Sequence, residues 1–139
     1  MPFPVSASQY GSSVASDFAI KNFEDIERTG SDGVDRRFSR KLLDSTELGV
    51  SRWRYEPGMR TVGHRHQVQE EVYTVISGSG RLKLDDEIIE IKQWDVIRVA
   101  PQVARGFEAG PDGLEIIAAG GASRRAETGE LVEGHWPDD

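Results

Sequence analysis

Two of the three histidines in the chain, His64 and His66, are separated by one residue and followed by a carboxylate, Glu71, that opens a β-type run. In a β-strand, residues i and i+2 point to the same side, so both imidazoles can be directed at one point. Two imidazoles and a carboxylate suit a borderline divalent metal. Because the chain has no cysteine, any metal must be held by histidine, carboxylate or water. The spacing therefore predicts a divalent metal site.

Short β-type runs separated by turn residues fill the middle of the chain. We expect strands over residues 36–43, 49–55, 61–66, 71–77, 80–84, 87–92, 95–99, 104–109 and 114–119. Glycine-rich separators at 77–80 and 110–113 read as turns. Many short strands at regular spacing, with almost no helical period, favour a β-sandwich or β-barrel.

Composition divides the chain into three parts. Residues 1–33 begin with a serine-rich stretch of weak periodicity, which indicates an N-terminal arm that is flexible or packs on a partner. Residues 34–120 contain the β-type runs and form the expected sandwich or barrel domain. Residues 121–139 are acidic and begin glycine-rich, and we expect a C-terminal tail that packs through Trp136.

The charge balance limits the classes of partner. A net charge of −7 argues against a nucleic-acid partner, which requires a basic face. We interpret the one short basic cluster, Arg36-Arg37 followed by Arg40-Lys41, as solvated faces of a strand. No apolar stretch approaches the ~20 residues that cross a bilayer, and the N-terminus lacks signal-peptide features. We therefore expect a cytoplasmic protein with neither a membrane nor a nucleic-acid partner.

One set of residues resembles, in type and spacing, the first signature of the cupin superfamily: Gly58, His64, His66, Glu71 and Gly78. Glu71 rather than Glu70 is the matching carboxylate, because only Glu71 leaves six residues before Gly78. The chain is similar to a group of small single-domain bacterial cupins. This resemblance implies an all-β fold, an antiparallel double-stranded β-helix or jelly-roll barrel, with the site inside its mouth and frequent dimerisation.

The chain departs from the cupin pattern at one ligand. The second cupin signature normally supplies a fourth metal ligand, a histidine, a few residues after a proline. Counting from Pro101, that position is Arg105. An arginine carries a permanent proton and cannot coordinate a cation.

The departure leaves three interpretations open. In the first, His64, His66 and Glu71 hold Fe, Mn, Ni or Zn, and Arg105 pairs with an anionic substrate of an oxygenase or isomerase. Tyr73 and Phe107, which share strand parity with Glu71 and Arg105, are further candidates for substrate contact. Packing in the barrel wall is the alternative for these two aromatic residues.

The second interpretation is a metal-free barrel. Arg105 then pairs with Glu71, and the pocket binds a small molecule as a sensor or carrier. The third is a barrel without a working site that serves only for dimerisation. In all three we expect a homodimer, because exposed edge strands and a loose N-terminal arm favour pairing.

Overall fold

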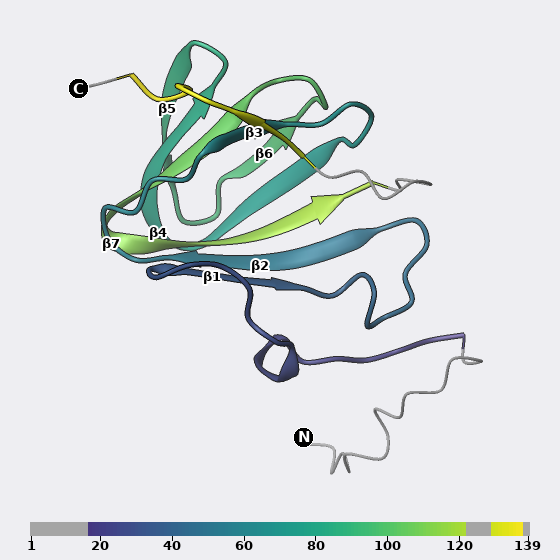
Figure 1. Cartoon of the computed structure of the whole chain (residues 1–139). Helices are drawn as coiled ribbons and strands as arrows, with labels where there is room; N and C mark the ends of the chain where they lie inside the picture. The colour runs from purple at the N-terminus through teal and green to yellow at the C-terminus, as the bar shows by residue number, and fades with distance from the viewer. Residues whose placement is uncertain (1–16, 122–128, 138–139) are drawn as a thin grey trace.

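A computed structural model describes residues 17–121 and 129–137, and these residues form strands and one short 3-10 helix (Figure 1). Every pairing between these strands is antiparallel. In chain order the elements are η2 (Phe23–Asp25), β1 (Val34–Phe38), β2 (Gly49–Tyr55), β3 (Gly63–Arg65), β4 (Glu71–Leu84), β5 (Glu87–Lys92), β6 (Val96–Val99), β7 (Arg105–Gly120) and β8 (Glu130–Val132).

The strands form two layers that share β4 and β7. One layer contains β1, β2, residues 114–120 of β7, residues 71–78 of β4, and β6. The other contains β8, β3, residues 105–109 of β7, residues 80–84 of β4, and β5. The layers face each other across the interior (Figure 1). This arrangement confirms the predicted antiparallel jelly-roll barrel.

The two longest strands pass from one layer to the other without a break, so the turns predicted at 77–80 and 110–113 were wrong. Gly78 and Gly113 have φ angles of 78° and 79°, and a Cβ on Gly78 would lie 2.0 Å from the Gly113 carbonyl oxygen. Glycine adopts positive φ without a steric penalty and leaves room for this close approach. The paired strands therefore bend together, with register shifts around residues 75–80.

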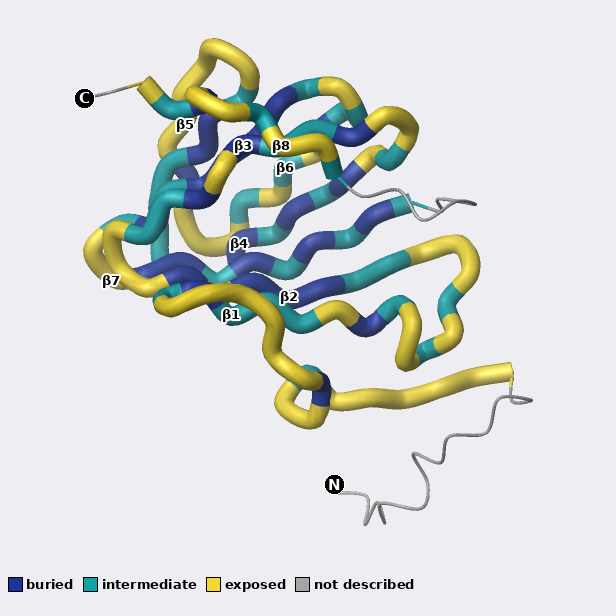
Figure 2. The backbone as a smooth tube through the Cα atoms, viewed as in Figure 1, coloured by how far each residue is buried: buried dark blue, intermediate teal, exposed yellow. Residues whose placement is uncertain are grey.

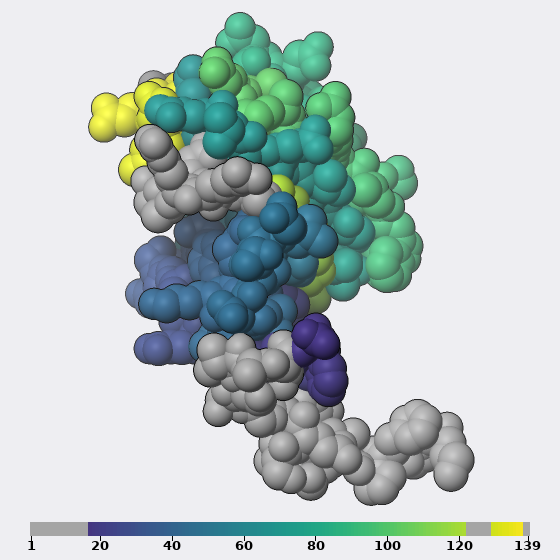
Figure 3. All heavy atoms as spheres, turned by 90° about the vertical axis from the view of Figure 1, so that its right-hand side faces the viewer, coloured from purple at the N-terminus to yellow at the C-terminus, as the bar shows by residue number. Residues whose placement is uncertain are grey.

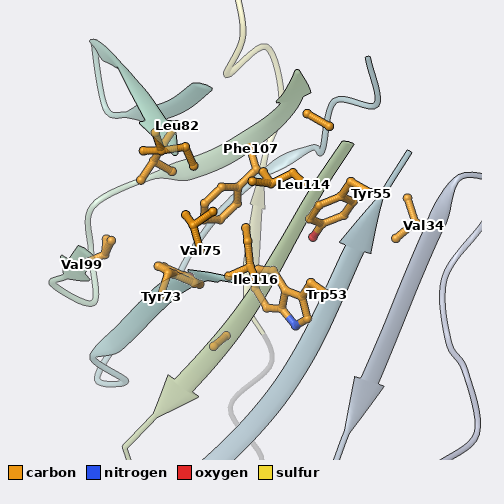
Figure 4. Close-up of a cluster of buried hydrophobic side chains, with 13 residues drawn as sticks. Val34, Trp53, Tyr55, Tyr73, Val75, Leu82, Val99, Phe107, Leu114 and Ile116 are labelled. Atoms are coloured by element: carbon orange, nitrogen blue, oxygen red, sulfur yellow. The ribbon is translucent and has the colours of Figure 1, made fainter. Parts of the chain in front are cut away.

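The packed core lies between the layers, where inward side chains of β4 and β7 meet those of β2 (Figure 4). Tyr73, Val75, Leu82, Phe107 and Ile116 are all at most 1% exposed. Buried segments concentrate along β2, β4 and β7, whereas the connections are exposed (Figure 2). The core therefore holds β4 and β7 in fixed positions. The first residues of these strands are Glu71 and Arg105.

The described part of the C-terminal segment packs on the barrel. β8 pairs with β3, and Trp136 donates from its indole nitrogen to the Thr61 carbonyl oxygen at 3.0 Å. His135 lies against Gly63 and Gly106, and its Nε2 is 3.0 Å from the Lys83 carbonyl oxygen. The expected packing through Trp136 agrees with these contacts, while residues 122–128 and 138–139 of the predicted tail and residues 1–16 of the predicted arm lie outside the described residues.

No helix in the described residues has the length and apolar character needed to cross a membrane.

Candidate metal centre and cavity

The three predicted ligands converge where the two layers face each other. His64 lies on β3, His66 follows that strand, and Glu71 is the first residue of β4. One ligand atom from each residue lies within 4.8 Å of the other two. The Nε2 atoms of His64 and His66 are 3.6 Å and 3.0 Å from Oε1 of Glu71. The spacing of the histidines and the choice of Glu71 over Glu70 both agree with this geometry.

Backbone pairing holds the two imidazoles in place. His64 is paired with Arg105 of β7 on one side and with Leu131 of β8 on the other. The His66 amide donates to the Pro101 carbonyl oxygen at 2.7 Å. Gly129 lies over both rings, because a Cβ at this position would be 3.1 Å from Cδ2 of His64 and 3.3 Å from Cε1 of His66. The C-terminal segment thus contributes to the position of the rings.

The Glu71 carboxylate is held from the side opposite the cavity. The Tyr73 hydroxyl donates to Oε1 of Glu71 at 2.5 Å, and Nη1 of Arg105 lies 3.7 Å from the same oxygen. Burial raises the pKa of the Glu71 carboxyl, but the contacts with His64, His66 and Tyr73 outweigh burial and hold this pKa well below its usual range. The Glu71 carboxyl is therefore anionic, as a carboxylate metal ligand must be.

Arg105 is fully buried and does not line the cavity. Its Nη2 donates to the Ala100 carbonyl oxygen at 2.6 Å, and its Nη1 donates to the Pro101 carbonyl oxygen at 3.4 Å. A buried guanidinium requires a counter-charge and hydrogen-bond acceptors, which Glu71 and these carbonyl groups provide. This placement agrees with the pairing of Arg105 and Glu71 and gives no route for direct contact between Arg105 and a substrate.

Tyr73 and Phe107 belong to the packed core and are not among the cavity-lining residues. Their ring centres are 5.0 Å apart at an interplanar angle of 74°. Burial, reinforced by the neighbouring Glu71 charge, raises the pKa of Tyr73 well above its usual value, so the phenol keeps its proton and donates to Glu71. The two aromatic residues therefore take the packing role, with Tyr73 also acting on the carboxylate.

Two of the three separations between the candidate ligand atoms fit a divalent cation. Ligands bound at about 2.0–2.2 Å with angles near 90–110° are separated from one another by roughly 3–3.6 Å. The Nε2–Oε1 separations of 3.0 Å and 3.6 Å lie in this range. Nitrogen and carboxylate donors without thiolate suit Fe, Mn, Ni or Zn. Three protein ligands leave further coordination positions for water or substrate.

A cavity of about 800 Å³ opens beside the three ligands, which form part of its wall. Figure 3 views the molecule from the right-hand side of Figure 1, with the β1–β2 region in blue below the later strands in teal and green. Apolar lining comes from residues such as Val34, Val50 and Trp53, and Glu71 is the one carboxylate among the described residues that line the cavity. Four basic side chains also contribute to the wall: Arg36, Arg40, Lys41 and Arg60.

The interpretation of the basic cluster as solvated faces of a strand was incomplete, because Arg36, Arg40 and Lys41 line this cavity. The signal for Arg36 was present in the sequence, since it alternates with the apolar residues Val34 and Phe38 on β1. Gly129, by contrast, gave no signal, because its position over the imidazoles depends on the pairing of β8 with β3.

The sequence matches the Cupin domain family over residues 51–120, about half of the chain. The matched segment contains most of β2, all of β3 to β7 and all three candidate ligands. The chain belongs to the cupin family.

Comparison with individual proteins agrees with this assignment. The chain is 31% identical over 77 residues to an uncharacterized protein of Methanocaldococcus jannaschii, covering 55% of this chain and 62% of that protein, so it spans less than two thirds of the relative. Bacillus subtilis oxalate decarboxylase, a protein with Mn(II) centres, has a TM-score of 0.69 at 22% identity, over 79% of this chain and 31% of that one. KdgF from Halomonas sp. has a TM-score of 0.63 at 15% identity, over 73% of this chain and 90% of that one. The two solved structures show the fold.

Proposed function

We propose that this cupin is a divalent-metal-dependent enzyme that acts on an anionic small molecule in the barrel cavity. One observation carries the proposal: one ligand atom each from His64, His66 and Glu71 gathers within 4.8 Å at the wall of a cavity of about 800 Å³. Cavities of this size accommodate small metabolites. A metal held at that wall would face a bound small molecule.

A divalent cation would supply Lewis-acid polarisation of a substrate oxygen or, as iron, a centre for oxygen chemistry, which match the isomerase and oxygenase expectations. The chain's own residues position the groups around it. Tyr73 and Arg105 fix the Glu71 carboxylate from behind, and Trp53 forms the neighbouring wall with its ring centre 6.3 Å from that of His64. Such supporting contacts fix ligand orientation and tune a metal site.

Metal binding is the direct test. Protein stripped with a chelator should take up close to one equivalent of Mn(II), Fe(II), Ni(II) or Zn(II) in calorimetric titration and elemental analysis. His66→Ala and Glu71→Gln should each weaken binding by more than about 100-fold, because losing a mere supporting contact costs 10–100-fold. Glu70→Gln is the matched control, since Glu70 is the exposed neighbour. The proposal fails if none of the four metals binds with a micromolar or lower dissociation constant. It also fails if Glu71→Gln binds the metals as tightly as the wild type does.

The metal-free carrier or sensor is the second candidate, and the position of Arg105 favours it. Its Nη1 is 3.7 Å from Oε1 of Glu71, so the carboxylate already has a buried counter-charge that repels a dication. Under this alternative, Arg105→His should create metal affinity that the wild type lacks. Under the metal proposal, the wild type binds metal before any substitution.

The homodimer and the small-molecule partner complete the proposal. Large apolar side chains are exposed on β5 and in the segment from there to β6, with Ile88 and Ile89 about 40% exposed and Trp94 and Val96 each 66% exposed. Sedimentation equilibrium tests the dimer, and the cytoplasmic location stays a prediction.

A further inference from the structure

An arginine lines the cavity without a carboxylate partner among the described residues. Arg36 is the middle residue of β1, and the strand alternation places it on the same side as Val34 and Phe38, all three of which line the cavity. Asp35 and Arg37 lie on the opposite side and pair with each other. The outer side of β1 thus carries the Asp35–Arg37 ion pair, and its inner side carries the Arg36 cation.

Two aromatic rings orient the Arg36 guanidinium. Its Cζ lies 5.7 Å from the ring centre of Trp53 and 5.5 Å from that of Tyr55, within the range of cation–π attraction. Its Nε donates to the Tyr55 hydroxyl oxygen at 3.3 Å. Burial raises the pKa of Tyr55, so this hydroxyl stays neutral and leaves the arginine charge uncompensated. The two terminal amino groups remain as a fork that matches the two oxygens of a carboxylate.

Trp53 connects this arginine to the candidate metal centre. The indole lies next to Arg36 on one side, and its ring centre is 6.3 Å from that of His64 on the other. Arg36 and Trp53 are direct partners across the β1–β2 ladder, so their relative position is set by the backbone. The indole is thus close to both the guanidinium and one candidate ligand, so a small molecule lying along it can approach both.

The other cavity charges support an anion. Arg40 and Lys41 line the cavity beside Arg36, and Arg40 uses its Nη2 to hold the carbonyl oxygens of Gly120 and Gly121. The one acidic group in the described lining, Glu71, is matched by the buried Arg105. The cavity is thus basic in a chain whose net charge is −7, and a cleft of one sign concentrates ligands of the opposite sign.

We propose that the cavity binds an organic carboxylate whose acid group pairs with the terminal amino groups of Arg36 and whose other end carries an oxygen that reaches the His64, His66 and Glu71 centre along Trp53. This inference names the substrate class of the proposed enzyme and rests on that function for its catalytic meaning. The sequence predicted that Arg105 binds the anion. Because Arg105 is enclosed in the wall, we assign this role to Arg36.

The test uses two probes of one shape, glutarate and its uncharged analogue glutaramide, titrated calorimetrically into the full chain with and without saturating Mn(II). Glutarate should bind at least tenfold more tightly than glutaramide. Arg36→Gln should weaken glutarate binding at least tenfold, because hydrogen bonds to charged groups are the strong ones. Arg36→Lys, which keeps the charge and loses the fork, should fall between. Arg98→Gln, on an exposed arginine of β6, should bind glutarate as the wild type does.

The outcomes separate this inference from the proposed function. If Mn(II) binds but glutarate does not bind at millimolar concentration, or binds Arg36→Gln as well as the wild type, the carboxylate site is overturned and the metal centre stands. If glutarate binding depends on Arg36 but none of the metals binds, the proposed enzyme fails and the carboxylate site stands. Unchanged Mn(II) affinity in Arg36→Gln and Arg36→Lys confirms that both variants fold with the metal centre intact.

Discussion

The inward faces of β4 and β7 and those of β1 and β2 belong to one barrel but contain different kinds of side chain. The interior of β4 and β7 is closed by apolar groups such as Val75, Leu82 and Ile116, all fully buried. The interior beside β1 and the adjoining part of β2 leaves a cavity, whose wall contains Arg36 and the edge of the core at Trp53. The candidate ligands lie at the boundary between the two regions. The packed region supplies rigidity and the hollow region supplies access.

Two arginines show the same contrast. Arg105 in the packed region has a counter-charge and two carbonyl acceptors, whereas Arg36 in the hollow region has aromatic rings and one phenol oxygen. A counter-charge and acceptors within the fold suit a residue that holds a buried carboxylate in place. Unused donors suit a residue that binds a molecule from solution. The role of an arginine here follows from its acceptors rather than from its type.

The largest expected effect is on folding. Phe107→Ala should lower the free energy of unfolding by about 3–5 kcal/mol, because it opens a void in the closed region. Val62→Ala, at a cavity-lining residue that is 60% exposed, should change it by less than about 0.5 kcal/mol. Urea denaturation measures both. Equal losses would show that the cavity wall is packed as tightly as the core.

The arginines should differ in the same direction. Arg105→Met should cost about 3 kcal/mol of unfolding free energy, because it leaves Glu71 without its buried cation. Arg36→Met should cost about 1 kcal/mol or less, the size of a cation–π contact. The same denaturation experiment measures both, and a larger cost for Arg36→Met would contradict the division of roles.

A smaller change should affect the metal and leave the fold intact. Gly129→Ala places a methyl group against both imidazoles and should weaken metal binding by about tenfold, as expected when ring orientation is disturbed. Gly121→Ala is the control, because nothing lies within 4 Å of a Cβ at that position. Calorimetric titration with Mn(II) compares them. Equal affinities would mean that the C-terminal segment does not position the rings.

The smallest expected effect concerns the outer face of β7, where Glu108 lies between Arg81 and Arg60. The pKa of Glu108 is lowered chiefly by the hydrogen bond from Arg81 and further by the hydrogen bond from Arg60. Burial opposes this shift but does not cancel it. A carboxyl whose pKa is lower in the folded state stabilises the fold above its unfolded pKa of about 4.3, and this contribution is lost as the pH falls through the folded pKa. Glu108→Gln should therefore be less stable than the wild type at neutral pH, with a difference that shrinks in acid. A constant difference in urea denaturation would refute this assignment.

Much of the fold and of the site could be predicted because the cupin spacing is local in the sequence. The parity of His64 and His66 and the interval from Glu71 to Gly78 predicted the three candidate ligands, and the structure brings one atom of each within 4.8 Å of the others. What the sequence could not reveal depends on contacts between distant segments. Gly78 alone indicates a turn, and only its close approach to Gly113 explains why a strand continues through it. The sequence predicts that Arg105 contacts substrate, because nothing local shows that the Ala100 and Pro101 carbonyl groups accept its hydrogen bonds.

Anomalous diffraction from crystals loaded with Mn(II) locates the metal directly. We expect one peak per chain at about 2.0–2.2 Å from Nε2 of His64, Nε2 of His66 and Oε1 of Glu71. A crystal soaked in saturating Mn(II) that shows no peak between these atoms, with the imidazoles hydrogen-bonded directly to the carboxylate, would contradict the proposed metal centre.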